Sequence, residues 1–485
     1  MSRNKTKKQI LFTAFEAAPF IKTGGLGDVA GSLPKAVKSP EYDIRVILPL
    51  LKDIPGEYKE KMAFQCDFEV KLGWRNSYCG LFRLRKGGVT YYFLDNEYYF
   101  HRDKVYGEFD DGERVAYFSK AVLETIKHIK GFSPDIIHCN DWHTALVPVF
   151  YHESYKGAPG YEDIKTIFTI HNLKFQGQYD RGIVGDVLGL GGTPAEGQML
   201  HDNAVNYIQG AAIYCDEITT VSPTYAENIC TAEYGEGLEG LFRSRSYKLR
   251  GIVNGIDYAE YNPAADKNIA KNYDINSLTD KKANKAKLQE MLGLPVKEDV
   301  PLFAMVTRMT AQKGMDFVKQ LIDEFANMNM QLAILGTGDA EYESMAKEAA
   351  GRYPDRISAS IKFDEKLSRM FYAGADCFMM PSVFEPCGLA QMMAMRYGTL
   401  PLVRKTGGLK DTVMGLWDYG EEATGFAFED ADAGGLMAAV KQAVYVWEND
   451  RKLWERMQNN AMSQDFSWAK SAELYTAMYD EILSR

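Results

Sequence analysis

The residues that could do chemistry begin at Glu385, which follows a short apolar segment at 377–380. Pro386 and Gly388 come next, before a helical pattern over 389–397. Proline suits the first turn of a helix, and glycine lets a ligand approach the backbone closely. A helix start here would offer free amide hydrogens to an anion, with the Glu385 carboxylate at its rim. The alternative is that Glu385 is only a surface acid that caps the helix.

A glycine-rich loop occurs twice in the chain. KTGGLGD at 22–28 lies between a predicted strand and a predicted helix, and KTGGLKD at 405–411 repeats six of its seven positions. Lys22 supplies a positive charge, and the position between strand and helix is where open α/β sheets bind ligands. A single copy would more often be a tight turn, but the repetition predicts two related half-sites for an anion.

Two cations lie five residues apart in another loop between a strand and a helix. Arg308 and Lys313 follow the apolar segment 302–306, and the helical pattern begins at Met315. Arginine binds phosphate through its planar fork and lysine binds it as a point charge, so the pair could clamp a diphosphate. The alternative is a solvated basic turn. In an acidic chain with two glycine-rich loops, the anion site is the favoured interpretation.

Polar residues also end two predicted strands of the first half. Asp141 and His143 follow the segment 135–139, and His171 and Asn172 follow the next strand. Each could be a satisfied core residue, but polar groups at adjacent carboxyl ends predict a polar pocket. The Asp and His residues do not have ligand spacing on one element, so we expect no metal.

These residues can form a site only if the fold brings the ends of their strands together. The sequence alternates short apolar strands with helices, which indicates parallel sheets that do this. We predict an α/β protein with two Rossmann-like, doubly wound parallel sheets whose carboxyl edges face a cleft. Strands are expected at 10–15, 44–50, 135–139, 166–170, 217–221, 302–306, 331–335, 357–363, 377–380 and 400–403. Helices are expected at 29–37, 199–214, 281–292, 366–375, 389–397 and 468–484. The predicted domains are 1–249 and 250–462, with a last helix in 463–485 that packs back on the first domain.

Composition narrows the class of protein. The chain has 485 residues, a globular 46% hydrophobic content and a formal net charge of −10, which argues against a nucleic-acid or anionic-membrane partner. No segment is apolar for long enough to span a membrane, and we expect no signal peptide. The seven cysteines are scattered, without a CxxC pair, so a disulfide framework is not indicated. A cytoplasmic protein is expected.

Taken together, the motifs resemble those of bacterial-type glycogen and starch synthases, which are retaining glucosyltransferases of the GT-B fold. The resemblance covers nearly the whole chain. It rests on KTGGLGDV at 22–29, HCNDWH at 138–143, TIHN at 169–172, VNGID at 253–257, the segment 308–314, FEPCGL at 384–389, YGTLPLVRKTGGL at 397–409 and DFSW at 465–468.

The resemblance implies transfer of glucose from a nucleotide sugar, expected to be ADP-glucose, to the non-reducing end of an α-1,4-glucan. The glucan would be glycogen or a maltooligosaccharide. Lys22, Gly24 and Gly25 would contact the donor diphosphate from the first domain, while Arg308 and Lys313 would hold it from the second. No cofactor or metal is implied, and domain closure around the donor is expected.

Other roles come from the same resemblance. Glu385 would stabilise positive charge at the anomeric carbon, and His171 would line the sugar site. Phe363 would stack on the nucleotide base, whether adenine or uracil. The other implied donor contacts are Asn254, Cys387, Gly388, Leu389, Thr406, Gly407 and Gly408, and the implied acceptor or sugar contacts are Asp28, Asp141 and Asn172.

Two positions depart from the wider pattern. Met393 stands where many GT-B enzymes carry a second glutamate, which agrees with these synthases. This leaves two roles open: Glu385 acts as a nucleophile, or the leaving phosphate deprotonates the acceptor on the same face, which is the favoured interpretation. Ala390 replaces a polar side chain of some relatives, which bears on the choice of donor.

Other functions remain alternatives. One is a non-catalytic glucan-binding or regulatory homologue, and another is a different retaining GT-B transferase that uses UDP-glucose or makes sucrose. A phosphorylase would need a pyridoxal-phosphate lysine, for which we find no motif. A dinucleotide oxidoreductase is disfavoured because neither glycine loop is GxGxxG. The sequence does not define the oligomeric state.

Overall fold

The computed structural model describes residues 7–485, which divide into two compact units. The first unit contains the described residues up to Gly255 together with Trp468–Arg485, and the second spans Ile256–Ser467. We expected no signal peptide in the Lys-rich first residues of the chain. Most of these residues lie outside the described part of the structure. Within residues 7–485, no helix combines the length and the hydropathy that crossing a membrane requires.

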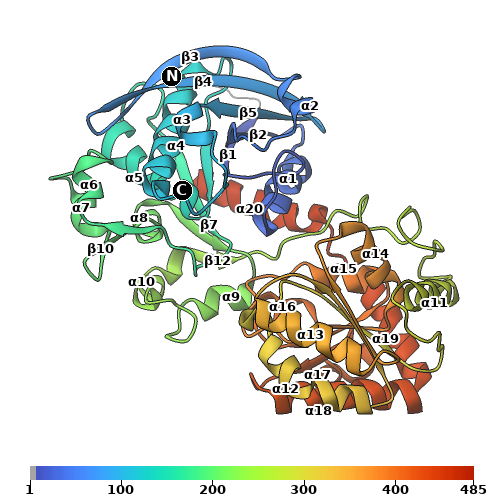
Figure 1. Ribbon diagram of the computed structural model, residues 1–485. Coiled ribbons are helices and arrows are strands. Elements are labelled where there is room, and N and C mark those ends of the chain that lie inside the picture. The colour runs from blue at the N-terminus through green and yellow to red at the C-terminus, as the bar shows by residue number, and fades with distance from the viewer. Residues whose placement is uncertain (1–6) are drawn as a thin grey trace. The chain divides into compact units, whose positions relative to one another are not determined.

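Among its described residues, the first unit has a nine-stranded sheet in the order β12-β11-β7-β6-β1-β2-β5-β4-β3 (Figure 1). The strands from β12 to β5 are parallel, and β4 and β3 continue the sheet as an antiparallel hairpin. The strands are β1 Lys8–Thr13, β2 Tyr42–Pro49, β3 Ala63–Leu72, β4 Arg75–Lys86, β5 Val89–Asp95, β6 Ile136–Asn140, β7 Lys165–Ile170, β11 Glu217–Thr220 and β12 Leu249–Gly251. The longer helices are α1 Gly25–Val37, α4 Asp111–Thr125, α8 Tyr207–Tyr214 and α20 Trp468–Ser484, and the shorter ones are α2 Gly56–Lys59, α3 Glu97–Phe100, α5 Leu146–Phe150, α6 Ile183–Asp186, α7 Pro194–Gln198, α9 Pro223–Asn228 and α10 Glu239–Ser244.

The order of this sheet reverses between β1 and β6. From β1 the chain passes to β2 on one side, and it returns at β6 on the other side before continuing to β7. Loops that leave the two central strands therefore diverge at their carboxyl ends, which is the position where such sheets bind ligands. The central strands are buried on both faces, as the continuous apolar run Ile10, Leu11 and Phe12 shows, because helices cover the sheet.

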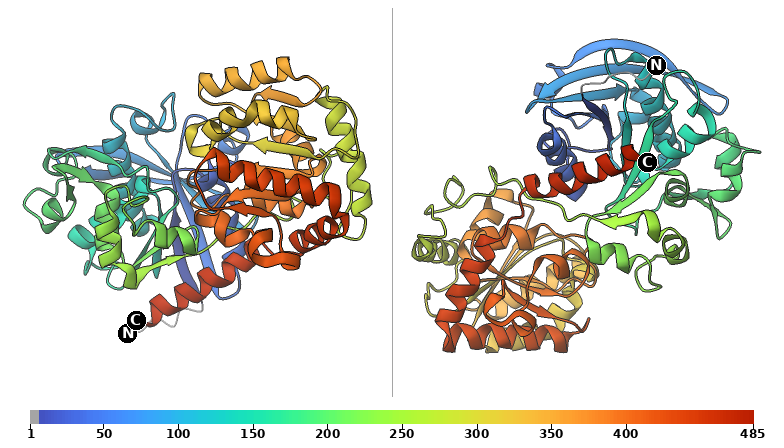
Figure 2. Two further views of the ribbon diagram at one scale, coloured as in Figure 1. Left: turned by 90° about the horizontal axis from the view of Figure 1, so that it is seen from below. Right: turned by 180° about the vertical axis from the view of Figure 1, so that it is seen from behind.

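Helix α20, the last element, belongs to the first unit. It packs on α1, and the two helices lie side by side in Figure 1 and Figure 2, where α20 is red and α1 blue. Its buried face includes Tyr479, whose hydroxyl lies 2.8 Å from Nδ1 of His138 on β6. The Tyr42 hydroxyl on β2 donates to the carbonyl of Thr476 at 3.2 Å. The last helix thus closes the core of a unit that the chain left more than two hundred residues earlier.

The second unit is a six-stranded parallel sheet, in the order β15-β14-β13-β16-β17-β18, with helices around it (Figure 1). Its strands are β13 Leu302–Val306, β14 Gln331–Gly336, β15 Ile357–Ile361, β16 Cys377–Met380, β17 Leu400–Arg404 and β18 Phe426–Phe428. Its helices are α11 Lys281–Met291, α12 Met315–Asn327, α13 Ala340–Arg352, α14 Glu365–Gly374, α15 Ala390–Arg396, α16 Gly407–Thr412, α17 Leu416–Tyr419, α18 Ala433–Asn449 and α19 Arg451–Ser463. The strand order reverses between β13 and β16, which makes their carboxyl ends the second expected ligand crevice.

One predicted helix is wrong in its first half. The segment 199–214 was expected to be helical throughout, but β9 Leu200–His201 and β10 Ala204–Asn206 form an antiparallel pair before α8 begins. Asp202 and Asn203 turn the chain with positive φ angles of 47° and 65°, which short polar residues tolerate better than others. Asn206 then caps α8 by accepting a hydrogen bond from the amide of Gln209 at 3.0 Å. Turn and capping chemistry thus overrode the apolar pattern.

Candidate active site

The second unit brings the predicted carboxylate and one predicted cation together. Lys313 lies on the loop after β13 and Glu385 on the loop after β16, and these strands are neighbours at the reversal of the sheet. Lys313 Nζ donates to Glu385 Oε2 at 2.6 Å, and Ser382 Oγ donates to the same oxygen at 3.1 Å. The carboxyl side chain is almost fully buried, so the ion pair offsets the cost of desolvating it.

Arg308, the other predicted cation, is not engaged in this way. It lies two residues after β13 and is exposed, and its guanidinium has no hydrogen bond or ion pair within residues 7–485. Gly314 lets the loop that carries both cations pass close to the backbone of Pro381. Its φ is +74°, and a Cβ there would lie 2.0 Å from the carbonyl oxygen of Pro381. The site therefore contains one neutralised cation and one available cation.

The second glycine loop packs against the backbone of Glu385 and the residues that follow it. A Cβ at Gly407 would lie 2.1 Å from the Glu385 carbonyl oxygen, and one at Gly408 would lie 2.2 Å from that of Cys387. The Gly408 amide donates to the Glu385 and Pro386 carbonyls at 3.1 Å. Contact of Gly407 and Gly408 with a phosphate stays a prediction, and so does that of Thr406, a buried residue that precedes α16.

We expected Pro386 in the first turn of a helix. This prediction is wrong, because α15 begins only at Ala390. Gly388 interrupts the helical path with a φ of +71°. Gln391 fills the space beside it and donates through Nε2 to the carbonyls of Cys387 and Gly388 at 3.1 and 3.0 Å. Cys387, Gly388 and Leu389 thus form a tight turn before the helix, and their predicted contact with a donor is untested.

In the first unit, hydrogen bonds to the buried side chain of Glu16 hold the loop after β1. Glu16 accepts hydrogen bonds from the amide and the hydroxyl of Thr23, at 2.5 and 2.8 Å. Burial raises the pKa of Glu16 above its usual value, and its hydrogen bonds only partly offset this. Sequence reasoning missed Glu16, although a single acid inside the apolar run FTAFEAAPF was a usable signal.

Lys22, Gly24 and Gly25 are exposed on this loop. Lys22 Nζ lies 2.8 Å from Asp28 Oδ1, so this cation is also paired with a carboxylate. A Cβ on either glycine would meet nothing within 4 Å, in contrast to the tightly packed glycines of the second copy. The two similar sequences therefore have different structural surroundings, and only the first presents its glycines openly.

Asp141 and His171 meet where β6 and β7 end. The Asp141 carboxylate accepts the His171 amide at 2.7 Å, and burial raises the pKa of Asp141 to about 7. His171 Nε2 lies 2.9 Å from Asn140 Oδ1, while Asn140 Nδ2 donates to Thr13, so Nε2 carries the proton. Burial lowers the pKa of His171 to about 3, so the ring is neutral and its Nδ1 can accept a hydrogen bond. We predicted no role for Asn140 from the sequence, because we considered only the neighbouring Asp141 and His143 for the polar pocket.

The predicted polar pocket does not include His143. Its ring is buried against Phe15, Tyr106 and Trp142, with centroid distances of 5.4, 4.4 and 4.3 Å, because the turn after Asp141 directs it into the core. Asn172 is partly exposed, and its Oδ1 accepts the amide of Lys174 at 3.1 Å.

Two other predicted residues keep groups available. Asn254 is buried, and its Oδ1 has no hydrogen-bond partner among the described residues. Phe363 follows β15 and is 83% exposed, so a ring face is accessible. Over residues 7–485, no three His, Cys, Asp or Glu side chains are grouped to hold a metal ion.

Two family models match the chain. Residues 9–244 match the model described as "Starch synthase catalytic domain", and residues 289–464 match "Glycosyl transferases group 1". The glycogen synthase of Clostridium novyi is 47% identical over 98% of this chain and 99% of its own, and that of Lactobacillus acidophilus is 46% identical over 98% and 100%.

Solved structures are similar as well. The catalytic domain of starch synthase IV from Arabidopsis thaliana, bound to ADP and acarbose, has a TM-score of 0.90 and is 33% identical over 99% of this chain and all of that one. Sucrose-phosphate synthase from Thermosynechococcus elongatus, with a TM-score of 0.60 and 17% identity over 99% and 100%, shares the fold.

Proposed function

The chain belongs to the starch and glycogen synthase family of glycosyltransferases, and from this premise we propose that it elongates an α-1,4-glucan with glucose from ADP-glucose. Glucose would be added to the non-reducing end with retention of configuration. The relative solved with ADP bound favours adenine as the donor base, and the exposed Phe363 ring would stack on it. None of the seven cysteines, all within the described residues, forms a disulfide, which favours work in the cytoplasm.

The observation that carries this proposal is the Lys313–Glu385 pair, with Arg308 exposed on the same loop as Lys313. When the bond from C1 of glucose to the β-phosphate breaks, negative charge grows on the diphosphate and positive charge grows on the sugar. Arg308 and Lys313 would stabilise the first, and the Glu385 carboxylate the second. Lys22 is a third proposed contact to the diphosphate. These cations supply the charge that a metal gives elsewhere, so we propose that no metal is needed.

Retention would follow from a reaction on one face of the sugar. Met393 provides no second carboxylate, and Lys313 and Ser382 both hold Oε2 of Glu385, which suits a carboxylate that stabilises charge. The new bond from the acceptor O4 to C1 forms as the C1–phosphate bond breaks, and the acceptor proton passes to the departing diphosphate. His171 Nδ1, Asp141 and Asn254 would bind sugar hydroxyls, with Asp28 and Asn172 nearer the acceptor.

The test measures incorporation of glucose into a glycogen primer, with ADP-glucose and UDP-glucose supplied separately. We expect at least about tenfold higher kcat/KM with ADP-glucose, and a fall in kcat of roughly 10²–10³-fold in Glu385→Gln, which keeps the hydrogen bonds but not the charge. Glu385→Ala should collapse turnover, and Lys319→Met, on the exposed face of α12, serves as the charge-loss control. Thermal unfolding midpoints of all variants separate loss of charge from loss of fold.

Each part of the proposal has its own contradicting outcome. Nearly unchanged turnover in Glu385→Gln would remove the charge role of this residue. A preference for UDP-glucose would overturn the donor. Absence of transfer from either donor, with binding to glycogen intact, would indicate a non-catalytic glucan-binding homologue. A β-linkage in the product, seen by NMR, would exclude retention.

A further inference from the structure

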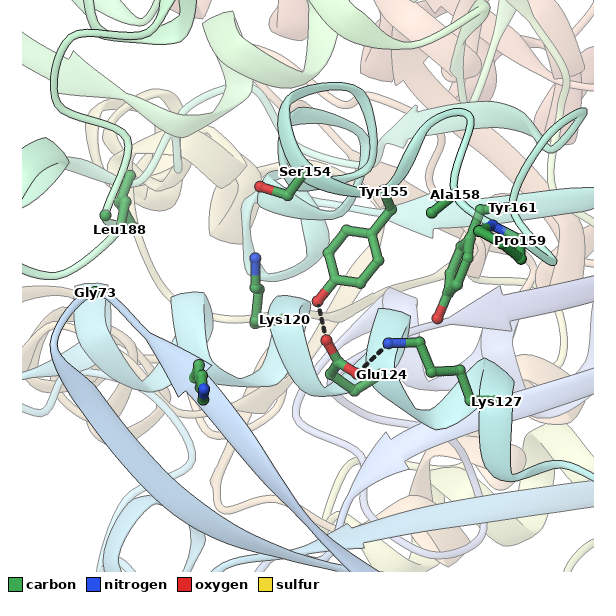
Figure 3. A pocket seen from close by; sticks show the side chains of 12 residues that line it. Gly73, Lys120, Glu124, Lys127, Ser154, Tyr155, Ala158, Pro159, Tyr161 and Leu188 are labelled. Carbon is green, nitrogen blue, oxygen red and sulfur yellow. Dashed lines mark hydrogen bonds and ion pairs between the residues drawn. The ribbon is translucent and has the colours of Figure 1, made fainter.

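A pocket of about 520 Å³ lies in the first unit and contains none of the residues proposed for glucosyl transfer. It is formed by the end of β3, the second half of α4, the segment 154–161 and the loop at Leu188 and Gly189 (Figure 3). Three lysines and one glutamate line it, so its lining carries an excess of two positive charges, in a chain whose net charge is −10. Such a local reversal of charge needs a physical reason.

The only carboxylate in the pocket lining, Glu124, is already satisfied. Lys127 Nζ lies 2.8 Å from Glu124 Oε2, and the Tyr155 hydroxyl donates to Oε1 at 2.5 Å (Figure 3). Burial alone would raise the pKa of Glu124, but these hydrogen bonds and the nearby lysines lower it below its usual value. Glu124 is therefore ionised, and its charge is matched by Lys127.

Lys120 has no direct anionic contact among the described residues, although the Glu124 charge one turn further along α4 attracts it. Its ammonium lies over the rings of Phe150 and Tyr155, 4.9 and 4.7 Å from their centroids, and it has no hydrogen bond or ion pair within residues 7–485. Burial lowers the pKa of Lys120 to about 8. Lys71, at the end of β3, is exposed and likewise unpaired within the described residues. A partly desolvated ammonium without a direct ion pair is costly, and a bound anion in contact with it would offset that cost.

A hydroxyl faces the same space. Ser154 belongs to the π-helical turn Tyr151–Tyr155, a type of turn that is rare and frequent at functional sites. This exposed side chain has no hydrogen-bond partner for its hydroxyl among the described residues, and in Figure 3 the hydroxyl and the Lys120 ammonium face the same space, with Leu188 on its other side. An ammonium and a hydroxyl that converge in this way match the oxygens of a phosphate group.

We propose that this pocket binds the phosphate group of a small metabolite, either orthophosphate or a phosphorylated sugar, through Lys120, Ser154 and Lys71. The volume lies in the range of small-molecule sites and exceeds what orthophosphate alone requires, so a sugar would fit beside Pro159 and Leu188. The site is separate from the donor site, and the proposal does not rest on the identity of the donor.

The test is isothermal titration calorimetry with orthophosphate, glucose 6-phosphate and glucose, with saturating ADP present to occupy a nucleotide site. We expect both phosphate compounds to bind and glucose not to bind. Lys120→Met, which keeps the apolar stem, should weaken phosphate binding by at least about tenfold, and Ser154→Ala should weaken it several-fold. Lys156→Met, on an exposed lysine outside the pocket, should leave it unchanged.

A second readout follows the proton on Lys120. An anion favours the charged ammonium, so binding at pH 8 should take up about half a proton, visible as a dependence of the heat on the buffer's ionisation enthalpy. The other titratable groups that line the pocket, Glu124, Lys127, Lys71, Tyr155 and Tyr161, are the remaining candidates for this proton. The uptake should therefore vanish in Lys120→Met.

The arms of the titration distinguish the ligands. Equal affinity for the two phosphate compounds would assign orthophosphate, and tighter binding of glucose 6-phosphate would assign a phosphorylated sugar. The proposal is overturned if neither binds at millimolar concentration, if glucose binds as tightly as its phosphate, or if folded Lys120→Met and Ser154→Ala bind as the wild type does.

Discussion

Two acidic side chains at strand ends are buried by different means. Glu385 loses its water but gains the ammonium of Lys313 and the hydroxyl of Ser382. Asp141 gains amide hydrogens, of which the His171 amide is one, and no cation, so burial dominates and raises its pKa to about 7. The first environment pairs the carboxylate with a cation, whereas the second makes the charge of Asp141 depend on pH.

This difference predicts how stability depends on pH. The pKa of Asp141 is about 7 in the folded protein and about 3.9 in an unfolded chain, so the folded state binds the additional proton between these values. The contribution of Asp141 to the free energy of unfolding should therefore fall as pH rises from 4 to 7. Asp141→Asn, which can still accept the His171 amide, should flatten this fall, and thermal unfolding midpoints between pH 5 and 7.5 measure it.

The control is Asp186→Asn in the same unit. Hydrogen bonds from Trp74 and Arg75 lower the pKa of the exposed Asp186, so its titration lies below this pH range and the difference from wild type should stay constant. Parallel curves for wild type and Asp141→Asn would contradict the raised pKa of Asp141.

At the scale of elements, the proposed chemistry depends on where each parallel sheet reverses. In the second unit, the neighbours β13 and β16 deliver Lys313 and Glu385, and in the first unit β1 and β6 deliver Lys22 and Asp141. Loops from adjacent strands meet only if their backbones can approach closely. Glycines at Gly314 and Gly407 allow this, since a side chain at either would collide with a carbonyl oxygen of the neighbouring loop.

The two glycine loops should therefore respond differently to alanine. At Gly407, with φ +44°, the new Cβ would lie 2.1 Å from the Glu385 carbonyl, so we expect a loss of about 2 kcal/mol or more of stability together with activity. At Gly24 the Cβ meets nothing within 4 Å, so stability should change by less than about 0.5 kcal/mol. Denaturant unfolding and donor KM separate the two.

If Gly24→Ala leaves stability intact but raises the donor KM, the open loop contacts the donor. Equal destabilisation by both substitutions would mean that the different surroundings of the two loops do not matter, and would contradict the prediction.

At the scale of the whole molecule, the first unit is assembled from both ends of the chain. Helix α20 supplies Tyr475, Tyr479 and Ile482 to its core, although the second unit lies between them and the rest of that core in sequence. The Tyr479 hydroxyl also pairs with the His138 ring, which burial keeps neutral by lowering its pKa to about 3. The native core of the first unit is therefore complete only when the last helix is in place.

Tyr479→Ala should destabilise the first unit by about 3–5 kcal/mol, because it opens a cavity and leaves the His138 nitrogen without its partner. Leu474→Ala on the same helix is the matched control, since this side chain is about half exposed and should cost less than about 0.5 kcal/mol. Thermal unfolding combined with limited proteolysis of the first unit measures both. A similar, small effect of the two substitutions would show that α20 contributes little to this core.

The sequence by itself determined the class of fold, the family and the loops that carry Lys22, Arg308, Lys313 and Glu385. It could do so because hydrophobic periodicity, glycine loops and strand-end polar residues are local features. Only the tertiary structure decided which side chains meet. It paired Lys313 with Glu385, placed His143 in an aromatic core, showed Glu16 beneath the Lys22 loop, and replaced half of a predicted helix with a hairpin. Burial, ion pairing and pKa arise from contacts between residues distant in the chain, and sequence spacing does not encode those distances.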